Sequence, residues 1–288
     1  MINFLKHQWI YFTISLVVIL TGLFFIWRWG YNYSIDFVGG SNLEYRLDRD
    51  VNISSVQTIV RQENIELIDI SLKNRDLLLR TKAIDEKKEA HLKQTLENQL
   101  PVKLTLLKSE TVGPVLGREM MRKTGIASLF AISGILMYMS FAFKGFNFAL
   151  AAVIALLHDF LVVMGVYAVL SHLMGAQIDT LFVTAVLTTM SFSVHDTIII
   201  FDKIREYLRT QGKGNSEYYA NRALTETLVR SVNNSMTIMF MLLALTLLGG
   251  STIRFFAATL LVGTITGTYS SPFIATPIVV WLEKRRKN

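Results

Sequence analysis

The sequence predicts an α-helical membrane protein, a bundle of six spans with one extracytoplasmic α+β domain. Three observations support this fold class. Hydrophobic residues make up 51% of the 288 residues and charged residues only 18%, against about 25% in ordinary soluble domains. Apolar runs of about 18 residues or more, the length a helix needs to cross the hydrocarbon core, recur along the chain. One long stretch between the first two runs is polar enough to fold in water.

Each predicted span follows one apolar run. The six runs are 8–27, 124–143, 146–171, 178–201, 231–253 and 255–282. The first run follows Lys6, as in a secretory signal peptide, but it is longer than a typical signal core and no small-residue cleavage site follows it. We therefore expect an uncleaved anchor, transmembrane helix 1 at residues 1–27. In the last run, Gly263, Gly267, Pro272 and Pro277 predict a kinked and closely packed sixth helix.

The stretch 28–123 is predicted to form the extracytoplasmic domain, and residues 124–288 supply transmembrane helices 2–6. Alternation of apolar and polar residues predicts strands, and amphipathic spacing predicts helices. The strands are expected at 42–47, 66–72, 77–81 and 101–108, and the helices at 53–62 and 84–100. Ser54 and Asp85 lie near the helix starts, where capping residues occur. The order βαββαβ predicts a ferredoxin-like domain.

Basic residues predict the orientation of the spans, because Lys and Arg in short loops resist translocation. If the N-terminus is cytoplasmic, the short outer loops hold only Arg254. The inner segments hold Lys6, Lys144, Lys203, Arg205, Arg209, Lys213, Arg222, Arg230, Lys284, Arg285, Arg286 and Lys287. Both termini and a basic loop at 202–230 are therefore expected in the cytoplasm. Membrane topology accounts for the net charge of +7, so we expect membrane lipids and no nucleic acid as partners.

Several chemistries are excluded by missing residues. Cysteine is absent, which removes disulfides, thiolate nucleophiles and cysteine-based metal sites. The sequence contains neither a P-loop nor the H-E-x-x-H and G-x-S-x-G motifs of zinc and serine hydrolases. We expect no cofactor, no metal and no enzymatic activity, and an energy source that is either a partner or the membrane gradient.

Ionisable residues inside two predicted spans are the candidates for ion coupling. A charged carboxylate at mid-bilayer costs about 2.5–3.5 kcal/mol on insertion scales, so a retained one usually faces a partner or water. His158 and Asp159 lie near the middle of one span. His195 and Asp196 lie in the next, and Asp196 is roughly 9 Å along the helix from Asp202 at its cytoplasmic end.

Helical spacing places other polar residues beside Asp196. Thr189 and Ser193 share its face, and Arg230 and Asn234 begin a similar stripe on the next span. A guanidinium near Asp196 would keep it ionised, and withdrawal of that cation would favour protonation. The alternatives are that His158 and Asp159 only join helices by hydrogen bonds, that Thr189 and Ser193 are packing residues rather than ion ligands, and that Arg230 only anchors its helix at the membrane surface.

Short motifs occur in order along the whole chain. They are SIDFVGGS at 34–41 with Asp36, Gly39 and Gly40; VGPVLGRE at 112–119 with Gly113 and Pro114; the pair His158 and Asp159; SFSVHDTIIIFDKIRE at 191–206; and GTYSS at 267–271 with Pro277. These segments resemble the signatures of the SecF family of bacterial protein-export subunits, a branch of the RND superfamily. Gly39 and Gly40 are expected to form a turn with positive φ.

The resemblance implies a subunit that pairs with SecD in a twelve-span assembly of the bacterial inner membrane. It would act with the SecYEG translocon on unfolded preproteins and draw on a proton or sodium gradient through Asp196 and Arg230. His195 replaces the family's asparagine, and such an imidazole could relay a proton or perturb Asp196 electrostatically. The alternatives are half of an RND-type exporter of small molecules or lipids, and a purely structural clamp on the translocon.

Overall fold

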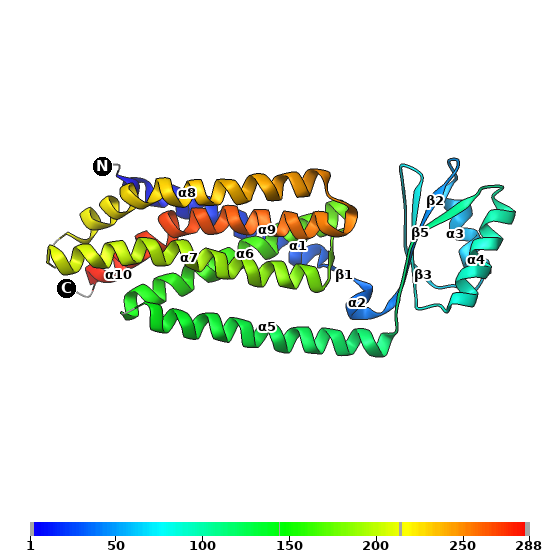
Figure 1. Ribbon diagram of the computed structural model, residues 1–288, viewed down its shortest axis with the longest axis horizontal. Helices are drawn as coiled ribbons and strands as arrows, with labels where there is room; N and C mark the ends of the chain where they lie inside the picture. Colours follow the sequence, from blue (N-terminus) through cyan, green and yellow to red (C-terminus); the bar gives the residue numbers. More distant parts are fainter. Residues whose placement is uncertain (1–2, 144, 213–214, 286–288) are drawn as a thin grey trace. The chain divides into compact units, whose positions relative to one another are not determined.

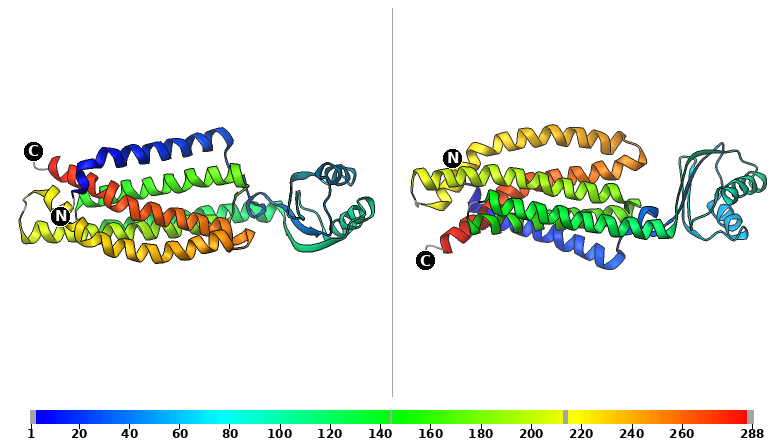
Figure 2. Two further views of the ribbon diagram at one scale, coloured as in Figure 1. Left: turned by 90° about the horizontal axis from the view of Figure 1, so that it is seen from above. Right: turned by 60° about the horizontal axis from the view of Figure 1, so that its bottom comes forward.

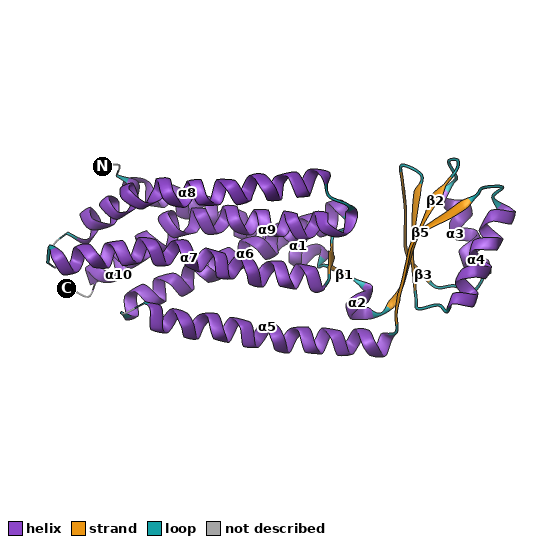
Figure 3. Cartoon of the chain, in the orientation of Figure 1, coloured by secondary structure: helices purple, strands orange, loops and turns teal. Residues whose placement is uncertain are grey.

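The chain is divided into two compact units, seen in the cartoon of Figure 3. The computed structural model describes residues 3–143, 145–212 and 215–285. Met1–Asn32 and Ala127–Asn288 form the helical unit, and Tyr33–Ile126 forms the unit that contains the main sheet. Four basic residues of the predicted inner segments, Lys144, Lys213, Arg286 and Lys287, lie outside the described residues.

Five described helices are long and apolar enough to cross a membrane. They are Phe4–Trp29, which joins a short 3₁₀ turn to α1 (Gln8–Trp29), α5 (Pro114–Ala142), α6 (Phe146–Met174), α7 (Thr180–Thr210) and α8 (Ser216–Leu248). The last apolar run is divided into α9 (Ser251–Ser270), a π-helical turn (Ser271–Ala275) and α10 (Thr276–Arg285). Two-residue strands β1 (Asn32–Tyr33) and β6 (Gln177–Ile178) are also present.

The helical unit is organised around α9, which packs against α6, α7 and α8, while α1 packs along α6 (Figures 1 and 2). Glycines permit the closest approaches. Gly22 of α1 faces Gly165 of α6, and neither position has room for a Cβ atom. Gly263 lies against the Thr189 side chain, and a Cβ on Gly267 would lie 3.0 Å from Ser193 Cα. The predicted close packing at Gly263 and Gly267 is confirmed, since small residues let membrane helices meet backbone to backbone.

The sixth apolar segment is not one continuous α-helix. The backbone N–H of Thr276 donates to the carbonyl of Ser271, five residues earlier, which defines the π-helical turn. Pro272 lies within this turn and Pro277 follows it. Because proline carries no N–H and its ring crowds the preceding turn, these two residues favour an interruption here.

One predicted boundary is wrong. The fifth span was expected to end at Ile253, but α8 ends at Leu248 and Ile253 belongs to α9. Gly249 and Gly250 adopt extended backbone with ψ of 152° and 164°, and this glycine pair separates the two helices. The apolar run continues through the break, so hydropathy alone does not reveal it.

The second unit contains a four-stranded antiparallel sheet with strand order β3-β4-β2-β5. Its elements are β2 (Gly40–Leu47), α3 (Ile53–Gln62), β3 (Leu67–Lys73), β4 (Asp76–Thr81), α4 (Glu86–Gln99) and β5 (Leu104–Val112). Side chains of the strands and of both helices form one buried cluster, which includes Leu43, Tyr45, Val60, Leu79, Leu92 and Leu96. Burial of these apolar side chains is the main stabilising contribution to the unit.

Local boundaries in this unit partly follow the predictions. Asp85 caps α4 as expected, because its carboxylate accepts the backbone N–H of Lys88 at 2.8 Å. The cap of α3 is Asn52 and not Ser54, whose own N–H donates to the Asn52 side chain. The last strand begins at Leu104, later than the predicted start at Pro101, since proline has no N–H to donate to a sheet ladder.

The glycine pair after the first helix forms the expected turn. Gly39 and Gly40 have φ angles of 77° and 141°, a region that residues with a Cβ rarely adopt. The turn follows α2 (Ile35–Val38), in which Asp36 donates its backbone N–H to the Ser34 hydroxyl. A Cβ on Gly39 would lie 2.7 Å from Pro114 Cα. The motifs at 34–41 and 112–119 are therefore in contact.

Candidate functional site

Asp196 lies in the interior of the helical unit. Its side chain is buried, with 2% of the residue exposed, and its Oδ2 accepts a hydrogen bond of 2.6 Å from the hydroxyl of Ser231 on α8. Thr189 and Ser193 of the same stripe are buried too, whereas His195 is exposed. The face of α7 that packs inside the bundle thus bears two hydroxyl groups and a carboxylate.

Arg230 is exposed, and among the described residues no ion pair joins it to Asp196. Asn234, the other residue expected on this stripe, is exposed as well. The buried face of α8 consists instead of Thr227, Ser231 and Ser235. Serines permit a close approach between membrane helices and can donate a hydrogen bond, so the packed face of α8 is one residue out of phase with the expected one.

A second buried carboxylate, that of Asp159 on α6, binds side chains from three helices. Its Oδ1 is 2.9 Å from Nδ1 of His158. Its Oδ2 accepts hydrogen bonds from Ser270 of α9, at 2.7 Å, and from Ser193 of α7. A carboxylate can only accept hydrogen bonds, and here three neighbouring side chains take the place of water as its hydrogen-bond partners. The structure thus joins His158, Asp159 and Ser193, which had been selected separately from the sequence.

The hydroxyl network continues from α7 to the π-helical turn. Thr197 and Ser271 share a hydrogen bond of 2.8 Å, and both residues are buried. Sequence reasoning missed Thr197, Ser231, Ser270 and Ser271 as members of the site. Thr197 lies four residues after Ser193, so helical spacing could have identified it. The serines of GTYSS had been noted only as part of the motif that resembles the family signature.

His195 lines a pocket of about 250 Å³ between α5 and α7. The other lining residues are Ile135, Tyr138, Ser191, Val194 and Ile198. The imidazole therefore lies on a different face of α7 from the buried carboxylate of Asp196, its neighbour in sequence, because consecutive helical residues point about 100° apart. No group of three or more metal-ligating side chains occurs among the residues with described positions, and the two buried carboxylates have hydroxyl partners.

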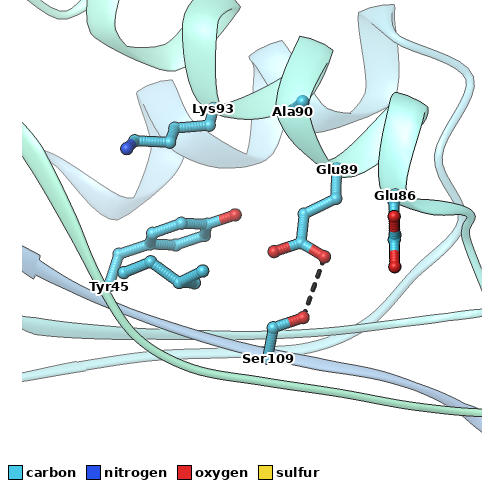
Figure 4. Close-up of a pocket in the computed structure, with 7 residues that line it drawn as sticks. Tyr45, Glu86, Glu89, Ala90, Lys93 and Ser109 are labelled. Atoms are coloured by element: carbon cyan, nitrogen blue, oxygen red, sulfur yellow. Dashed lines mark hydrogen bonds between the residues drawn. The ribbon is translucent and has the colours of Figure 1, made fainter.

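The α+β unit has a pocket of its own, with a volume of about 460 Å³ (Figure 4). Glu86, Glu89 and Lys93 of α4 line it together with Ser109 of β5, whose hydroxyl donates to Glu89 at 2.8 Å. Tyr45 lies at its base, and the Tyr45 hydroxyl is buried with no hydrogen-bond partner among the described residues. Burial and then the charge of Glu89 raise the pKa of Tyr45, so the phenol is neutral.

Comparison with known proteins identifies similarities along almost the whole chain. Residues 91–285 match the family model of protein export membrane protein SecD/SecF, C-terminal, and residues 32–51 match that of the SecD/SecF GG motif. The second match contains the turn at Gly39 and Gly40, and the first contains both buried carboxylates. The family models therefore include the elements from which the site is built.

Individual relatives agree with these matches. The chain is 37% identical to the protein translocase subunit SecF of Anaerolinea thermophila over 98% of this chain and 94% of the relative. It is also 37% identical to that of Thermobaculum terrenum, over 99% and 95%. The crystal structure of SecDF from Thermus thermophilus, a translocon-associated membrane protein, is similar with a TM-score of 0.86 and 30% identity, over 99% of this chain and 39% of that chain.

Proposed function

Because this chain belongs to the SecD/SecF family of protein export membrane proteins, we propose that it is an accessory, non-enzymatic subunit of the Sec protein translocase that couples an ion gradient to preprotein export. The observation that carries the coupling is the buried carboxylate of Asp196, held by the Ser231 hydroxyl at 2.6 Å. A carboxylate inside a membrane bundle that has no fixed cation beside it can bind and release a proton or a sodium ion.

Arg230 supplies the switch in this proposal. Arg230 directly precedes Ser231 on α8. A modest rotation or shift of α8 would therefore replace the Ser231 hydroxyl near Asp196 with the Arg230 guanidinium. An arriving guanidinium favours the ionised carboxylate, and its departure favours the neutral acid. The energetic coupling of ion binding to helix movement follows from this difference.

The exposed polar residues of α8 support a partner in the membrane. Arg230, Asn233, Asn234 and Thr237 are all exposed on one helix that is apolar enough to span the bilayer. Polar groups facing lipid are costly, so such a surface is expected to be covered by protein or water. A SecD subunit is the partner we assign to it, and the fusion of both names in the Thermus thermophilus relative, protein translocase subunit SecDF, is consistent with this assignment. The complete assembly would then have twelve spans, six from this chain.

We propose that the chain has the predicted orientation, with both termini in the cytoplasm of a bacterial cell. The N–H of Phe4 donates to the Asn221 side chain, and Lys284 pairs with Glu217 at 2.6 Å. The starts of α1 and α8 and the end of α10 therefore share one end of the helical unit. Basic residues gather at this end, namely Lys203, Arg205, Arg209, Arg222, Lys284 and Arg285, in agreement with the positive-inside rule.

The unit Tyr33–Ile126 would then be the extracytoplasmic domain predicted at 28–123. Its element order and its strand order β3-β4-β2-β5 support a ferredoxin-like fold. We assign it to the trans side of the membrane, where preproteins leave the SecYEG channel. Its pocket at Tyr45 and Glu89 offers hydrogen-bonding groups to a passing polypeptide.

The proposal is tested by export into proteoliposomes that contain the translocon, the SecD partner and this chain. Sodium and proton gradients are imposed independently, and export after the ATP-driven step is measured. The coupling proposal expects one of the two gradients to accelerate export only when this chain is present. Equal export with and without any gradient would favour the structural clamp, and efflux of a small molecule or lipid without a SecD partner would favour the exporter.

A further inference from the structure

Asn221 of α8 caps a helix to which it does not belong. Its Oδ1 accepts the backbone N–H of Phe4 at 2.9 Å and that of Leu5 at 3.3 Å. These two residues begin the 3₁₀ turn Phe4–His7, which leads into α1, and within the described part of the chain the N-cap residue Asn3 provides no side-chain hydrogen bond to the turn. The first N–H groups of a helix have no acceptor within the helix. Asn221 supplies that acceptor from another helix.

This contact is buried on both sides. Asn221 is 3% exposed, and Phe4 and Leu5 are buried as well. The amide nitrogen of Asn221 is also engaged, because Nδ2 donates to Oδ1 of Asn3 at 3.2 Å. A buried N–H that loses its acceptor is destabilising, since water does not take the place of the lost partner. Two N–H groups therefore oppose any movement of α8 that withdraws Asn221.

The capped turn is packed against other parts of the helical unit. The ring of Phe4 lies 6.2 Å from that of Phe273 in the π-helical turn, centroid to centroid, and the ring of Tyr11 lies 4.4 Å from that of Phe273. Further along α1, Gly22 faces Gly165 of α6 with no room for a Cβ atom. The start of α1 is thus held by α6 and the π-helical turn, so it does not turn together with α8.

Asn221 lies on the same side of α8 as Ser231. Asn221, Leu224, Thr227 and Ser231 are all buried, and their spacing of three or four residues places them along one side of a helix. A rotation of α8 that replaces Ser231 by Arg230 turns Asn221 through the same angle, because the residues of one helix move together. An asparagine side chain has only two torsions, so it cannot keep both N–H groups bound through such a rotation.

Two other contacts at this end of α8 restrain the helix less. Glu226 accepts from the hydroxyl of Tyr207 on α7 at 2.6 Å, and Glu217 pairs with Lys284 of α10 at 2.6 Å. Both glutamate side chains are partly exposed. Exposed pairs contribute little to stability, and long side chains can adjust to a rotation of the helix. The buried contact of Asn221 is therefore the one that depends most strongly on which face of α8 packs into the bundle.

We propose that Asn221 is a positioning residue, which fixes the phase of α8, meaning the face that α8 packs into the bundle, against the start of α1. In this phase Ser231 lies against Asp196. Replacement of Ser231 by Arg230 then requires release of the N–H groups at the start of α1, so this turn and the carboxylate of Asp196 respond to each other. The consequence for coupling rests on the proposed function, but the phase of α8 is measured without export.

The absence of cysteine from the chain permits a measurement of this phase. Thr227→Cys reports on the buried face of α8, and Val229→Cys reports on an exposed face. The hydroxyl of Thr227 donates to the carbonyl of Ala223 in its own helix, so the first reporter breaks no hydrogen bond between helices. Each single-cysteine chain reacts with a water-soluble thiol reagent, with Asn221 intact and then substituted. The ratio of the two reaction rates measures the phase, because only an accessible thiolate reacts.

We expect Asn221→Ala to raise the rate of Thr227→Cys relative to that of Val229→Cys at least about fivefold, because two N–H groups no longer favour the present phase. Asn221→Asp keeps an acceptor oxygen and should retain the low ratio. Asn234→Ala, the same change on the exposed face of α8, is the control and should also retain it. An unchanged ratio in Asn221→Ala would show that Asn221 only caps the turn. A ratio raised equally in Asn221→Asp would show that the acceptor does not position α8, and either result overturns the proposal.

A second measurement leaves Asn221 in place. Ser231→Ala removes another contact that favours the present phase, so linkage predicts faster hydrogen exchange at the amides of Phe4 and Leu5. Thr237→Ala is the control, because Thr237 is exposed and its hydroxyl donates to a carbonyl of its own helix. Equal exchange at both amides in the two variants would contradict the proposal even if Asn221→Ala failed to fold. Neither measurement uses export, so failure here is distinguishable from failure of the coupling proposal.

Discussion

The carboxylate of Asp196 on α7 accepts a hydrogen bond of 2.6 Å from Ser231, the residue that follows Arg230 on α8. The hydrogen-bond partner of the buried acid and the exposed cation Arg230 are thus adjacent residues on α8. Ser231 fixes the acid in the present arrangement, and the proposed coupling requires Arg230 to take over this position. The contact between Asp196 and Ser231 is therefore the first target for substitution.

Among the described residues, Ser231 makes the only side-chain hydrogen bond to Asp196, and Ser231→Ala removes it. We expect gradient-dependent export to fall several-fold while the protein still assembles, because interhelical hydrogen bonds in membranes contribute only about 0.6–1.7 kcal/mol to stability. Ser235→Ala is the matched control, one turn further along α8, where it loses a bond to Thr268 and not to Asp196. If both variants export equally well, Ser231 has no part in coupling.

Gly263→Ala should destabilise the helical unit, because its Cβ would meet the Thr189 side chain. Overpacking of this kind typically costs about 1–3 kcal/mol. Gly134→Ala on α5 is the control, since apart from the neighbouring residues and backbone of its own helix no described atom lies within 4 Å of the position of its Cβ. Thermal unfolding in detergent should show a lower midpoint for Gly263→Ala and an unchanged or higher midpoint for Gly134→Ala. The reverse order would contradict the packing of α9 on α7.

Asp159→Asn should lower stability more than Ser270→Ala. The aspartate accepts from His158, Ser193 and Ser270, and an amide offers fewer acceptor sites to these three donors. A buried donor left without a partner costs about 1–3 kcal/mol, whereas Ser270→Ala removes a donor and leaves two others on the carboxylate. Unfolding midpoints of the two variants, measured in the same detergent, provide the comparison. A smaller loss for Asp159→Asn would show that Asp159 is not the centre of this network.

The α+β unit should lose stability in acid through Asp48. The backbone N–H of Lys103 donates to Asp48 at 3.0 Å, and this bond lowers the pKa of the carboxyl below its usual value. A lowered folded-state pKa contributes stability above the unfolded-state value near 3.9, and the contribution is lost as the pH falls through the folded-state pKa. Hydrogen exchange of the full chain should show earlier opening at the start of β5 below about pH 4.

Asp48→Asn should reduce this pH dependence at the start of β5. Asp50→Asn is a suitable control, because Asp50 lies two residues away and its side chain is 82% exposed. Hydrogen exchange at Lys103 and Leu104 that responds identically to acid in the wild type and in Asp48→Asn would exclude this contribution. Both variants leave the helical unit unchanged.

The elements of the fold that depend on local signals could be predicted from the sequence. Positive φ at Gly39 and Gly40 follows from two adjacent glycines before a strand, and the Asp85 cap follows from residue chemistry at a helix start. Burial of Asp196 followed from its place in an apolar run. In each case a few neighbouring residues determine the outcome.

The partners across helices could not be predicted in the same way. Ser270 is 111 residues from Asp159, and a serine in a membrane helix gives no signal of which carboxylate it contacts. The face of α8 was misjudged because Arg230 and Asn234 are the more polar residues, whereas helix packing selected the smaller Ser231 and Ser235. The phase of a helix depends on its neighbours, and these lie far away in the sequence.

Asp196→Asn, assayed for gradient-driven export in proteoliposomes beside Asp202→Asn, tests the central claim most directly. Asp202 lies on the same helix and pairs with Arg205 at its exposed end. We predict that Asp196→Asn exports at the rate measured without a gradient, while Asp202→Asn responds to the gradient as the wild type does. Full gradient-driven export by Asp196→Asn would contradict the assignment of this carboxylate as the coupling site.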